Sequence, residues 1–404
     1  MALAALISAT QAVDDSGDAL RATLPLAGGT LVEHQARLAA AAGAGPIVIL
    51  VERLPAALTA AVDRLRRDGL QVDIARGLSD AVDRIHPDET LLLLADGCIA
   101  DPDLVLRVAD AGSPAILTVP DDADHARFER IDAGARWGGL LLIDGGRLRR
   151  TAAMLGEWDL ESTLLRSAVQ ESAARIPAYE DGDALVAIAQ TADDMEPLDR
   201  AVIAAARGDA ADWPARFLFP PIVDLAALPL ARRGVEPHLL AAGAAGVAVL
   251  AAPFALYGLR WTALLLLLLS GPLAAIAARL AAVRLAAIGR ARAIAIVRAG
   301  GAALVLALLG ADLAQSAGWG CLLLALLVPL AMAALLRERT VLGLVDEARA
   351  PPWLASLDGM IWAFLPVAII GEWLGGIALL AGYAAVSFAY VQHRVLRALS
   401  EVVV

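Results

Sequence analysis

The sequence predicts two parts of different fold class: an acidic α/β domain before Pro237, then an all-α bundle of six transmembrane helices. Three observations predict this. The chain has 404 residues, which is long enough for two domains. Hydrophobic residues make up 59% of it and are concentrated after Pro237, and the mean hydropathy of +0.66 is too high for one soluble globule. Before Pro237, short apolar runs alternate with segments of helical spacing.

That alternation predicts a mostly parallel sheet with helices on both faces. Apolar or β-branched runs of four to eight residues indicate strands, and apolar residues at i, i+3 and i+4 indicate helices. The expected strands are 3–8, 46–51, 71–75, 90–95, 115–119 and 139–143, and the expected helices are 31–42, 55–68, 79–85 and 198–206.

Asp96 directly follows the expected strand 90–95. Ligands of such sheets bind beyond the carboxyl ends of the strands. A carboxylate there can hold a divalent cation that bridges nucleotide phosphates, because hard cations prefer oxygen ligands. The alternative is a turn, since Asp-Gly is a common turn pair and Asp101-Pro102-Asp103 resembles a helix start. No catalytic residue is identified, because Ser16 and Ser162 lack a His/Asp arrangement.

The C-terminal part holds the apolar stretches that predict membrane helices. A bilayer core of ~30 Å needs ~20 helical residues. The last two stretches are shorter, and Gly371-Glu372-Trp373 between them is either a tight turn or a polar break in one long helix, so six crossings are preferred and five are the alternative. The stretches are 237–258, 261–280, 293–311, 318–336, 358–371 and 373–392.

The placement of the arginine residues favours six membrane crossings. Arginines lie before the first stretch and in alternate loops, and positive residues favour the cytoplasmic side. We therefore expect a multi-pass inner-membrane protein with both termini cytoplasmic. Arg279 and Arg298 lie near or within predicted helices, where they either snorkel or bind an anionic group such as phosphate.

Charge and composition exclude other classes. A net charge of −11 argues against nucleic acid as a partner. All 33 basic residues are arginine, so a mechanism that requires lysine has no lysine to use. Cys98 and Cys321 fall in different predicted domains, which gives no disulfide framework.

Residues 1–207 resemble sugar-nucleotide-type nucleotidyltransferases. The run from Pro25 to Gln35 (PLAGGTLVEHQ) is similar to that family's P-L-x-G-x-P-L-x-x-H segment, residues 91–103 to its metal-aspartate strand, and TADD at 191–194 to its closing D-T-x-x-D-L segment. The resemblance implies a Rossmann-like, GT-A-type mixed sheet that binds a nucleotide with Mg²⁺ or Mn²⁺ at Asp96. The family's paired glycines between Thr10 and Arg21, its lysine and its second metal aspartate near 187–189 are missing.

The junction and the C-terminal part resemble CDP-alcohol phosphotransferases. RFLFPPI at 216–222 and GVEPHLL at 234–240 look like that family's juxtamembrane helix and membrane start, so we expect an amphipathic linker at 208–236 and the membrane domain at 237–404. The family's D-G-x2-A-R-x8-G-x3-D-x3-D signature is eroded: Ala274, Ala275, Ala293 and Val297 stand where aspartates or glycine belong, and Ala278-Arg279 survives. No metal is therefore expected in the membrane domain.

Together these features favour a diverged relative of polar-lipid headgroup enzymes that lacks phosphotransferase chemistry and binds a nucleotide, a lipid or a partner. The alternative is a membrane-anchored nucleotidyl- or glycosyltransferase that works through the cytoplasmic domain; a transport role has no run of membrane carboxylates to support it. The expected partners are the bilayer, a nucleotide or CDP-alcohol, and a second copy or another subunit in the membrane. The candidate ligand-binding residues are Arg21, Gly28, Gly29, Arg279 and Arg284, with Asp96 as the metal ligand.

Overall fold

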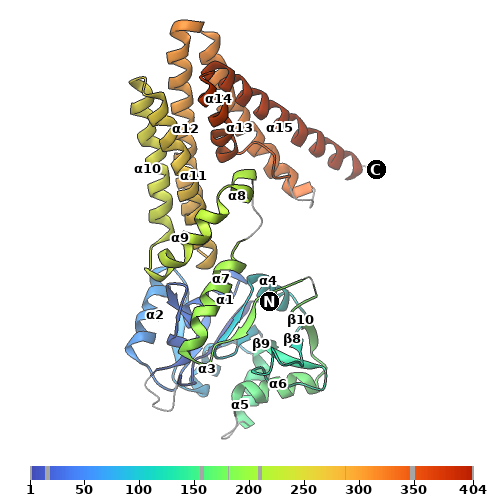
Figure 1. The fold of residues 1–404 in the computed structure, drawn as a ribbon. Coiled ribbons are helices and arrows are strands. Elements are labelled where there is room, and N and C mark those ends of the chain that lie inside the picture. The colour runs from blue at the N-terminus through green and yellow to red at the C-terminus, as the bar shows by residue number, and fades with distance from the viewer. Residues whose placement is uncertain are drawn as a thin grey trace. The chain divides into compact units, whose positions relative to one another are not determined.

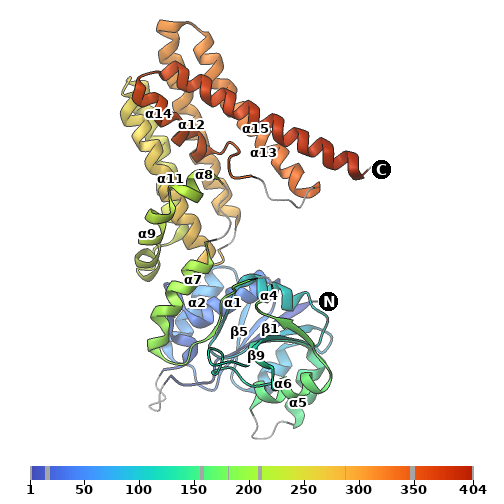
Figure 2. The same ribbon diagram turned by 45° about the vertical axis from the view of Figure 1, so that its right-hand side comes forward.

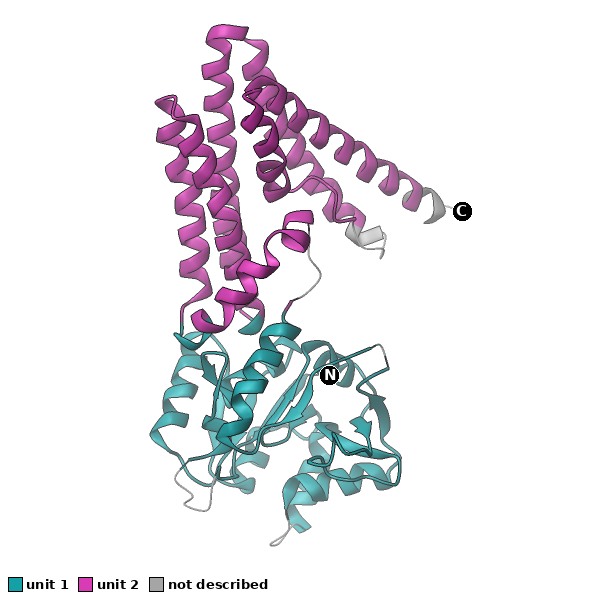
Figure 3. Cartoon of the chain, in the orientation of Figure 1, with its two compact units in different colours: residues 1–206, 231–234, 283–285 teal, residues 207–230, 235–282, 286–404 magenta. Residues whose placement is uncertain are grey.

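The computed structural model describes residues 2–13, 19–154, 159–180, 182–207, 212–286, 288–345 and 351–402. The chain divides into two compact units (Figure 3). The first contains residues 1–206 with 231–234 and 283–285, and the second contains 207–230, 235–282 and 286–404. The first is an α/β unit and the second is all-helical.

A seven-stranded mixed sheet forms the centre of the α/β unit, in the order β10-β8-β9-β6-β1-β4-β5 (Figures 1 and 2). Strands β6, β1, β4 and β5 are parallel, and β9 runs antiparallel between β6 and β8. Every residue of β4 is buried, which requires cover on both faces of the sheet. The strands are β1 (Leu3–Ser8), β4 (Ile47–Leu50), β5 (Val72–Ala75), β6 (Thr90–Leu94), β8 (Ala115–Pro120), β9 (Ala135–Asp144) and β10 (Ala174–Pro177).

Two groups of helices and two small ribbons complete this unit. Helix α1 packs on α2 and α4, whereas α5 packs on α3 and α6. A capping box starts α1, because the Glu33 carboxylate accepts the Thr30 backbone N–H at 2.8 Å. The helices are α1 (Leu31–Ala41), α2 (Ala56–Arg67), α3 (Leu78–Arg84), α4 (Pro102–Ala109), α5 (Gly145–Met154), α6 (Leu160–Gln170) and α7 (Met195–Ala205), and the ribbons pair β2 (Pro25–Leu26) with β3 (Gly29–Thr30) and β7 (Cys98–Ala100) with β11 (Val186–Ile188).

The strands and helices expected in the α/β part are confirmed, each within a few residues of its predicted bounds. The five strands that were not predicted are short, and β10 is also largely exposed and carries an arginine and a proline. They have neither the length nor the apolar alternation that identifies a strand in a sequence.

The second unit consists of helices, five of which are long and apolar enough to cross a membrane within the described chain. A sixth apolar helix, α14, has only 14 residues, so the sixth predicted crossing is not established by helix length. The helices are α8 (Trp213–Phe217), α9 (Pro220–Arg232), α10 (Pro237–Leu256), α11 (Arg260–Val283), α12 (Ile288–Ala317), α13 (Gly320–Val345), α14 (Leu357–Ile370) and α15 (Trp373–Val402).

Small residues bring two of these helices into close contact. Where α10 meets α12, a Cβ atom added to Gly301 would lie 3.0 Å from the backbone carbon of Ala248. Without a hydrophobic force between helices in lipid, such close backbone packing supplies much of the association energy. The alanine and glycine content here therefore serves helix packing.

Candidate functional site

The candidate site lies where the chain leaves β1 and β6 toward opposite sides of the sheet. Strand β1 leads through α1 to its neighbour β4, whereas β6 leads through α4 to β8 on the other side. The two strands are paired in parallel, with Ile7 opposite Leu94, so their carboxyl ends are adjacent. Open α/β sheets bind ligands at such a switch point. Asp96 is the second residue after β6.

Asp96 is a buried carboxylate, 4% exposed, whose two oxygens have different surroundings. Its Oδ2 accepts the backbone N–H groups of Thr10 at 2.9 Å and Gln11 at 2.8 Å, which fixes the segment after β1. Its Oδ1 is buried and has no hydrogen-bond partner within the described chain. Leaving such an oxygen unpaired costs about 1–3 kcal/mol. The alternative interpretation of Asp96 as a turn residue accounts for neither oxygen, because Oδ2 bonds to Thr10 and Gln11, which lie 86 and 85 positions away, and Oδ1 has no partner in the described chain.

A second carboxylate, Glu161, joins Asp96 from the first turn of α6. Its Oε1 accepts the backbone N–H of Asp96 at 3.1 Å, and the hydroxyl of Ser8 donates to the same carboxylate. Helix α6 starts there because Asp159 caps it, accepting the Ser162 N–H at 2.8 Å. Sequence reasoning missed Glu161. The cap at Asp159 predicts a helix start, but no sequence signal places that start beside β6.

Burial raises the pKa of both carboxyl groups. Burial raises the pKa of Asp96 to about 6, against the lowering effects of the Gln11 N–H and the Arg21 charge. Burial raises the pKa of Glu161 to about 7, and the negative charge of Asp96 raises it further. The predicted ligand-binding residue Arg21 thus lies close enough to act on Asp96, and its own Nε is buried without a partner in the described chain. The site combines two proton-holding acids with one cation.

The carboxylates fit a divalent cation only as a minimal pair. No group of three or more His, Cys, Asp and Glu side chains suited to a metal is present in the residues that the structure describes. Ala189, where the resemblance expects a second metal aspartate, is buried beside Asp96, and its N–H donates to the Gly97 carbonyl at 2.9 Å. Mg²⁺ is commonly held by one or two carboxylates together with phosphate oxygens and water. Asp96 and Glu161 would meet that pattern with phosphate supplied by a ligand.

Gly28 lies in a tight turn and Gly29 begins the strand β3 that follows it, so the two glycines do not form an extended phosphate loop. The turn joins β2 to β3, with φ of 49° at Ala27 and 83° at Gly28. A Cβ atom at Gly28 would lie 1.9 Å from the carbonyl oxygen of Ala231, so this glycine permits a close backbone approach. Arg284 lies beside the same turn, with Nη2 at 3.4 Å from that Cβ position. That Gly28, Gly29 and Arg284 contact a ligand stays a prediction.

Arg279 lies in the second unit, on α11. Its Nη1 is 3.5 Å from Oδ1 of Asp224, whose Oδ2 is 2.8 Å from Nη2 of Arg207. Asp224 therefore lies beside Arg279, and the positive charges around it are the two guanidinium groups. One carboxylate between two arginines leaves no set of acidic oxygens for a divalent cation.

The positions at which the phosphotransferase resemblance expects metal ligands do not form a metal site. Ala274 and Ala275 lie on α11, while Ala293 and Val297 lie on exposed positions of α12. In this part of α12, the buried polar side chain is that of Arg298. Restoring aspartates at Ala293 and Val297 would therefore place carboxylates on the outer face of α12.

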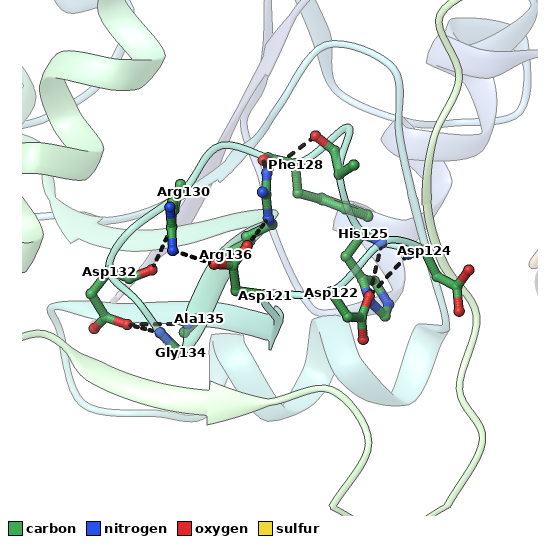
Figure 4. Close-up of polar contacts among 11 residues, drawn as sticks. Asp121, Asp122, Asp124, His125, Phe128, Arg130, Asp132, Gly134, Ala135 and Arg136 are labelled. Atoms are coloured by element: carbon green, nitrogen blue, oxygen red, sulfur yellow. Dashed lines mark hydrogen bonds and ion pairs between the residues drawn. The ribbon is translucent and has the colours of Figure 1, made fainter.

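Polar contacts fix the loop 121–134, which follows β8 at the carboxyl edge of the sheet (Figure 4). Asp121 pairs with Arg130 and Arg136, each at 2.6 Å. Asp132 accepts the backbone N–H groups of Gly134 at 2.9 Å and Ala135 at 3.1 Å, which closes the turn into β9. The loop is thereby held by its own side chains.

Side chains also tie this loop to its surroundings, among them the ion pairs of Arg127 with Asp194 at 2.8 Å and of Asp132 with Arg175 at 2.7 Å. His125 bonds through Nδ1 to Asp122 at 2.6 Å and through Nε2 to the Tyr179 hydroxyl at 2.7 Å (Figure 4 shows the Asp122 contact). Glu129 accepts the hydroxyl hydrogen of Ser162 at 2.8 Å. Because Ser162 follows Glu161, the contact between Glu129 and Ser162 places the loop at the rim of the candidate site.

Comparison with known proteins finds similarity among solved structures only. No family model matches the sequence, and no curated protein is similar to it. Among solved structures, a protein from Bacillus anthracis assigned as a glucose-1-phosphate thymidylyltransferase, in complex with a sucrose, is similar over 49% of this chain and 94% of its own, with 12% identity and a TM-score of 0.37.

Proposed function

We propose that this chain is a membrane-anchored nucleotide-binding protein whose α/β unit binds a nucleotide together with a divalent cation between Asp96 and Glu161. The observation that carries the proposal is the contact of buried Asp96 with partly buried Glu161 at the β1/β6 switch point, with an unpartnered oxygen on Asp96. The membrane unit serves as the anchor and does not transfer phosphoalcohols.

Electrostatics support a nucleotide accompanied by a cation rather than a bare phosphate. Above pH 7 the pair carries close to two negative charges, which would repel a phosphate group. A divalent cation removes that repulsion, takes the place of the protons that the raised pKa values retain, and presents Oδ1 of Asp96 with a partner. Arg21 supplies the remaining positive charge. Binding should therefore require the cation and strengthen between pH 6 and 8.

The test is a titration of the full chain in detergent with CTP and other nucleotides, with Mg²⁺, with Mn²⁺ and without either. We expect saturable binding only with the cation, weakened at least tenfold by Asp96→Asn and by Glu161→Gln. Asp73→Asn is the matched control, because Asp73 is a half-exposed carboxylate on the edge strand β5. Equal binding by all variants, or no binding at millimolar nucleotide, would contradict the proposal.

A second candidate function is transfer chemistry in the same site, as in a nucleotidyl- or glycosyltransferase. The observation that favours it is the pKa of Glu161, which at about 7 suits a general acid or base at physiological pH. If transfer occurs, Glu161→Gln should abolish turnover. Release of pyrophosphate or nucleoside diphosphate with sugar-phosphate or lipid acceptors would be measured.

A further inference from the structure

Three interhelical loops of the second unit meet at one end. The rings of Trp261 and Trp373 are 5.3 Å apart, which joins the start of α11 to the start of α15. Arg260 pairs with Asp312 at 2.7 Å, which adds the end of α12. Exposed Trp319 lies in the turn between α12 and α13. Tryptophan is enriched at bilayer interfaces, so this end, which we call the tryptophan end, marks one membrane surface.

Helix α14 ends at the tryptophan end and does not reach the other surface. Its last residue is followed by Gly371 in a left-handed conformation, φ 90°, and α15 starts at Trp373. Fourteen helical residues span about 21 Å of a bilayer core of roughly 30 Å. The N-terminus of α14 must therefore lie inside the bilayer, about two-thirds of the way across.

Contacts of the first turn of α14 agree with that depth. Asp358 forms a double hydrogen bond with the guanidinium of Arg298, whose Nε donates to Ser270 Oγ at 3.2 Å. Ser270 lies near the middle of α11, and Arg298 lies about 21 Å along α12 from Asp312. Gly271 allows the approach, since a Cβ atom there would lie 2.6 Å from Asp358 Oδ1.

The six residues before α14, 351–356, are largely non-helical, and side chains of α15 satisfy their backbone. Ser387, which is 0% exposed, accepts the Ala355 N–H at 3.0 Å, and the Tyr383 hydroxyl donates to the Trp353 carbonyl at 2.7 Å. Leu354 and Ala355 are buried. Irregular backbone at membrane depth is tolerated only where protein or a water-filled cavity surrounds it. Leu354 and Ala355 meet that requirement, whereas Trp353, nearer the start of the segment, is 44% exposed.

We propose that residues 351–370 form one discontinuous sixth crossing, made of the non-helical segment and α14, and that the Arg298–Asp358 pair holds its break inside the bilayer. The crossing is long enough, because it needs only ~9 Å beyond the helix, which six residues span even with the turn in which the Leu354 N–H bonds the Pro351 carbonyl. Six crossings place the α/β unit and the C-terminal end on the same side. Arg298 and Asp358 are positioning residues, each neutralising the other in a medium that tolerates neither charge alone.

The first test is topology in vesicles, read with a membrane-impermeant maleimide. Both native cysteines are buried, so the wild-type chain is the unlabelled control. We expect Arg233→Cys and Arg397→Cys to label from one side and Trp319→Cys from the other. Labelling of Arg233→Cys and Arg397→Cys from opposite sides would mean that 351–370 does not cross, and would overturn the proposal.

The second test is a double-mutant cycle on the ion pair, read as the unfolding midpoint of the full chain in detergent. Asp358→Leu and Arg298→Met should each lower the midpoint by about 5–10 °C, because each leaves a buried polar group uncompensated. The double variant Arg298→Met/Asp358→Leu should recover at least half of that loss. Asp312→Asn at the partly exposed Arg260 pair is the control, with a shift of about 2 °C or less. Single variants that match the control, or additive losses, would refute the role of the pair.

Discussion

At the scale of single residues, Asp96 and Glu161 cost the fold stability when they are charged. Both carboxyl groups have pKa values above those of the unfolded chain, so the neutral forms favour the folded state. Their contribution is present below pH 4 and is lost as the pH rises through 6 and 7. Carboxyl groups that stabilise the fold as ions would instead have lowered pKa values. Asp194 is an example: its hydrogen bonds with Arg127, Gln190 and Thr191 lower its pKa to about 2, despite the opposing effect of partial burial.

Glu161→Gln should therefore stabilise the α/β unit at pH 8 by about 2–3 kcal/mol and have no effect near pH 4. The amide keeps an acceptor for the Asp96 N–H and removes the buried charge. Hydrogen exchange of the β6 amides, compared with wild type at each pH, measures the difference. A variant that is less stable at pH 8 would show that the carboxylate is a stabilising group and would contradict the pKa order.

The sequence located one half of this site. Asp96 could be found because it follows a leucine run, and a residue after a buried strand lies at a known edge of the sheet. Glu161 could not, because its hydrogen bond to Asp96 joins residues that are 65 positions apart. The path of α6 onto the sheet depends on packing that no local pattern encodes.

At the scale of elements, the loop 121–134 is a separate polar unit that closes the rim of the site. Its order depends on Asp121, a largely buried carboxylate shared by Arg130 and Arg136. Phe128 is buried, and Ile131 packs partly buried against the core. Much of the local stability of this loop therefore rests on a few charged hydrogen bonds.

Asp121→Ala should loosen this loop without unfolding the sheet. Two arginines would lose their shared partner, at a cost of about 1–3 kcal/mol to the local structure. Limited proteolysis with trypsin should cut faster after Arg127 and Arg130. Asp122→Ala is the control for the separate His125 contact, and a cleavage rate unchanged in Asp121→Ala would show that the loop has another support.

The strands show how far patterns reach at this scale. The strands of the parallel core were predicted because they are apolar on both faces, as β4 is. The short pairs β2–β3 and β7–β11 were not, since strands of two or three residues have no period. The β7–β11 pair matters for the site, because it places Ala189 where a second carboxylate was expected.

At the scale of the whole molecule, the second unit consists of helices, and the positions that the phosphotransferase resemblance assigns to metal ligands carry no acidic side chains. Six apolar stretches predicted the helices, since hydropathy is set by composition along each segment. The broken crossing could not be predicted. Asp358 and Arg298 are 60 positions apart, and neither differs in sequence from a residue that snorkels to the membrane surface.

Incubation of the full chain with CDP-alcohols, lipid acceptors and Mg²⁺ should release no CMP above background. The physical reason is that Ala274, Ala275, Ala293 and Val297 supply no oxygen ligands for a cation. Release of CMP is measured chromatographically, and an intact phosphotransferase assayed in parallel shows that the substrates are competent. Turnover that survives Asp224→Asn would mean that another metal site exists in this unit.

The glycine turn at Gly371 has a consequence for biosynthesis. A 14-residue apolar helix is too short to settle across a bilayer on its own, and its inner end carries an acid. Because the turn joins α14 to α15, α14 can partition into lipid only together with α15, as a helical hairpin. By then α12 has been synthesised and has placed Arg298 in the membrane. Arg298, the counter-charge, is therefore synthesised and inserted into the membrane before Asp358, the acidic residue that requires it.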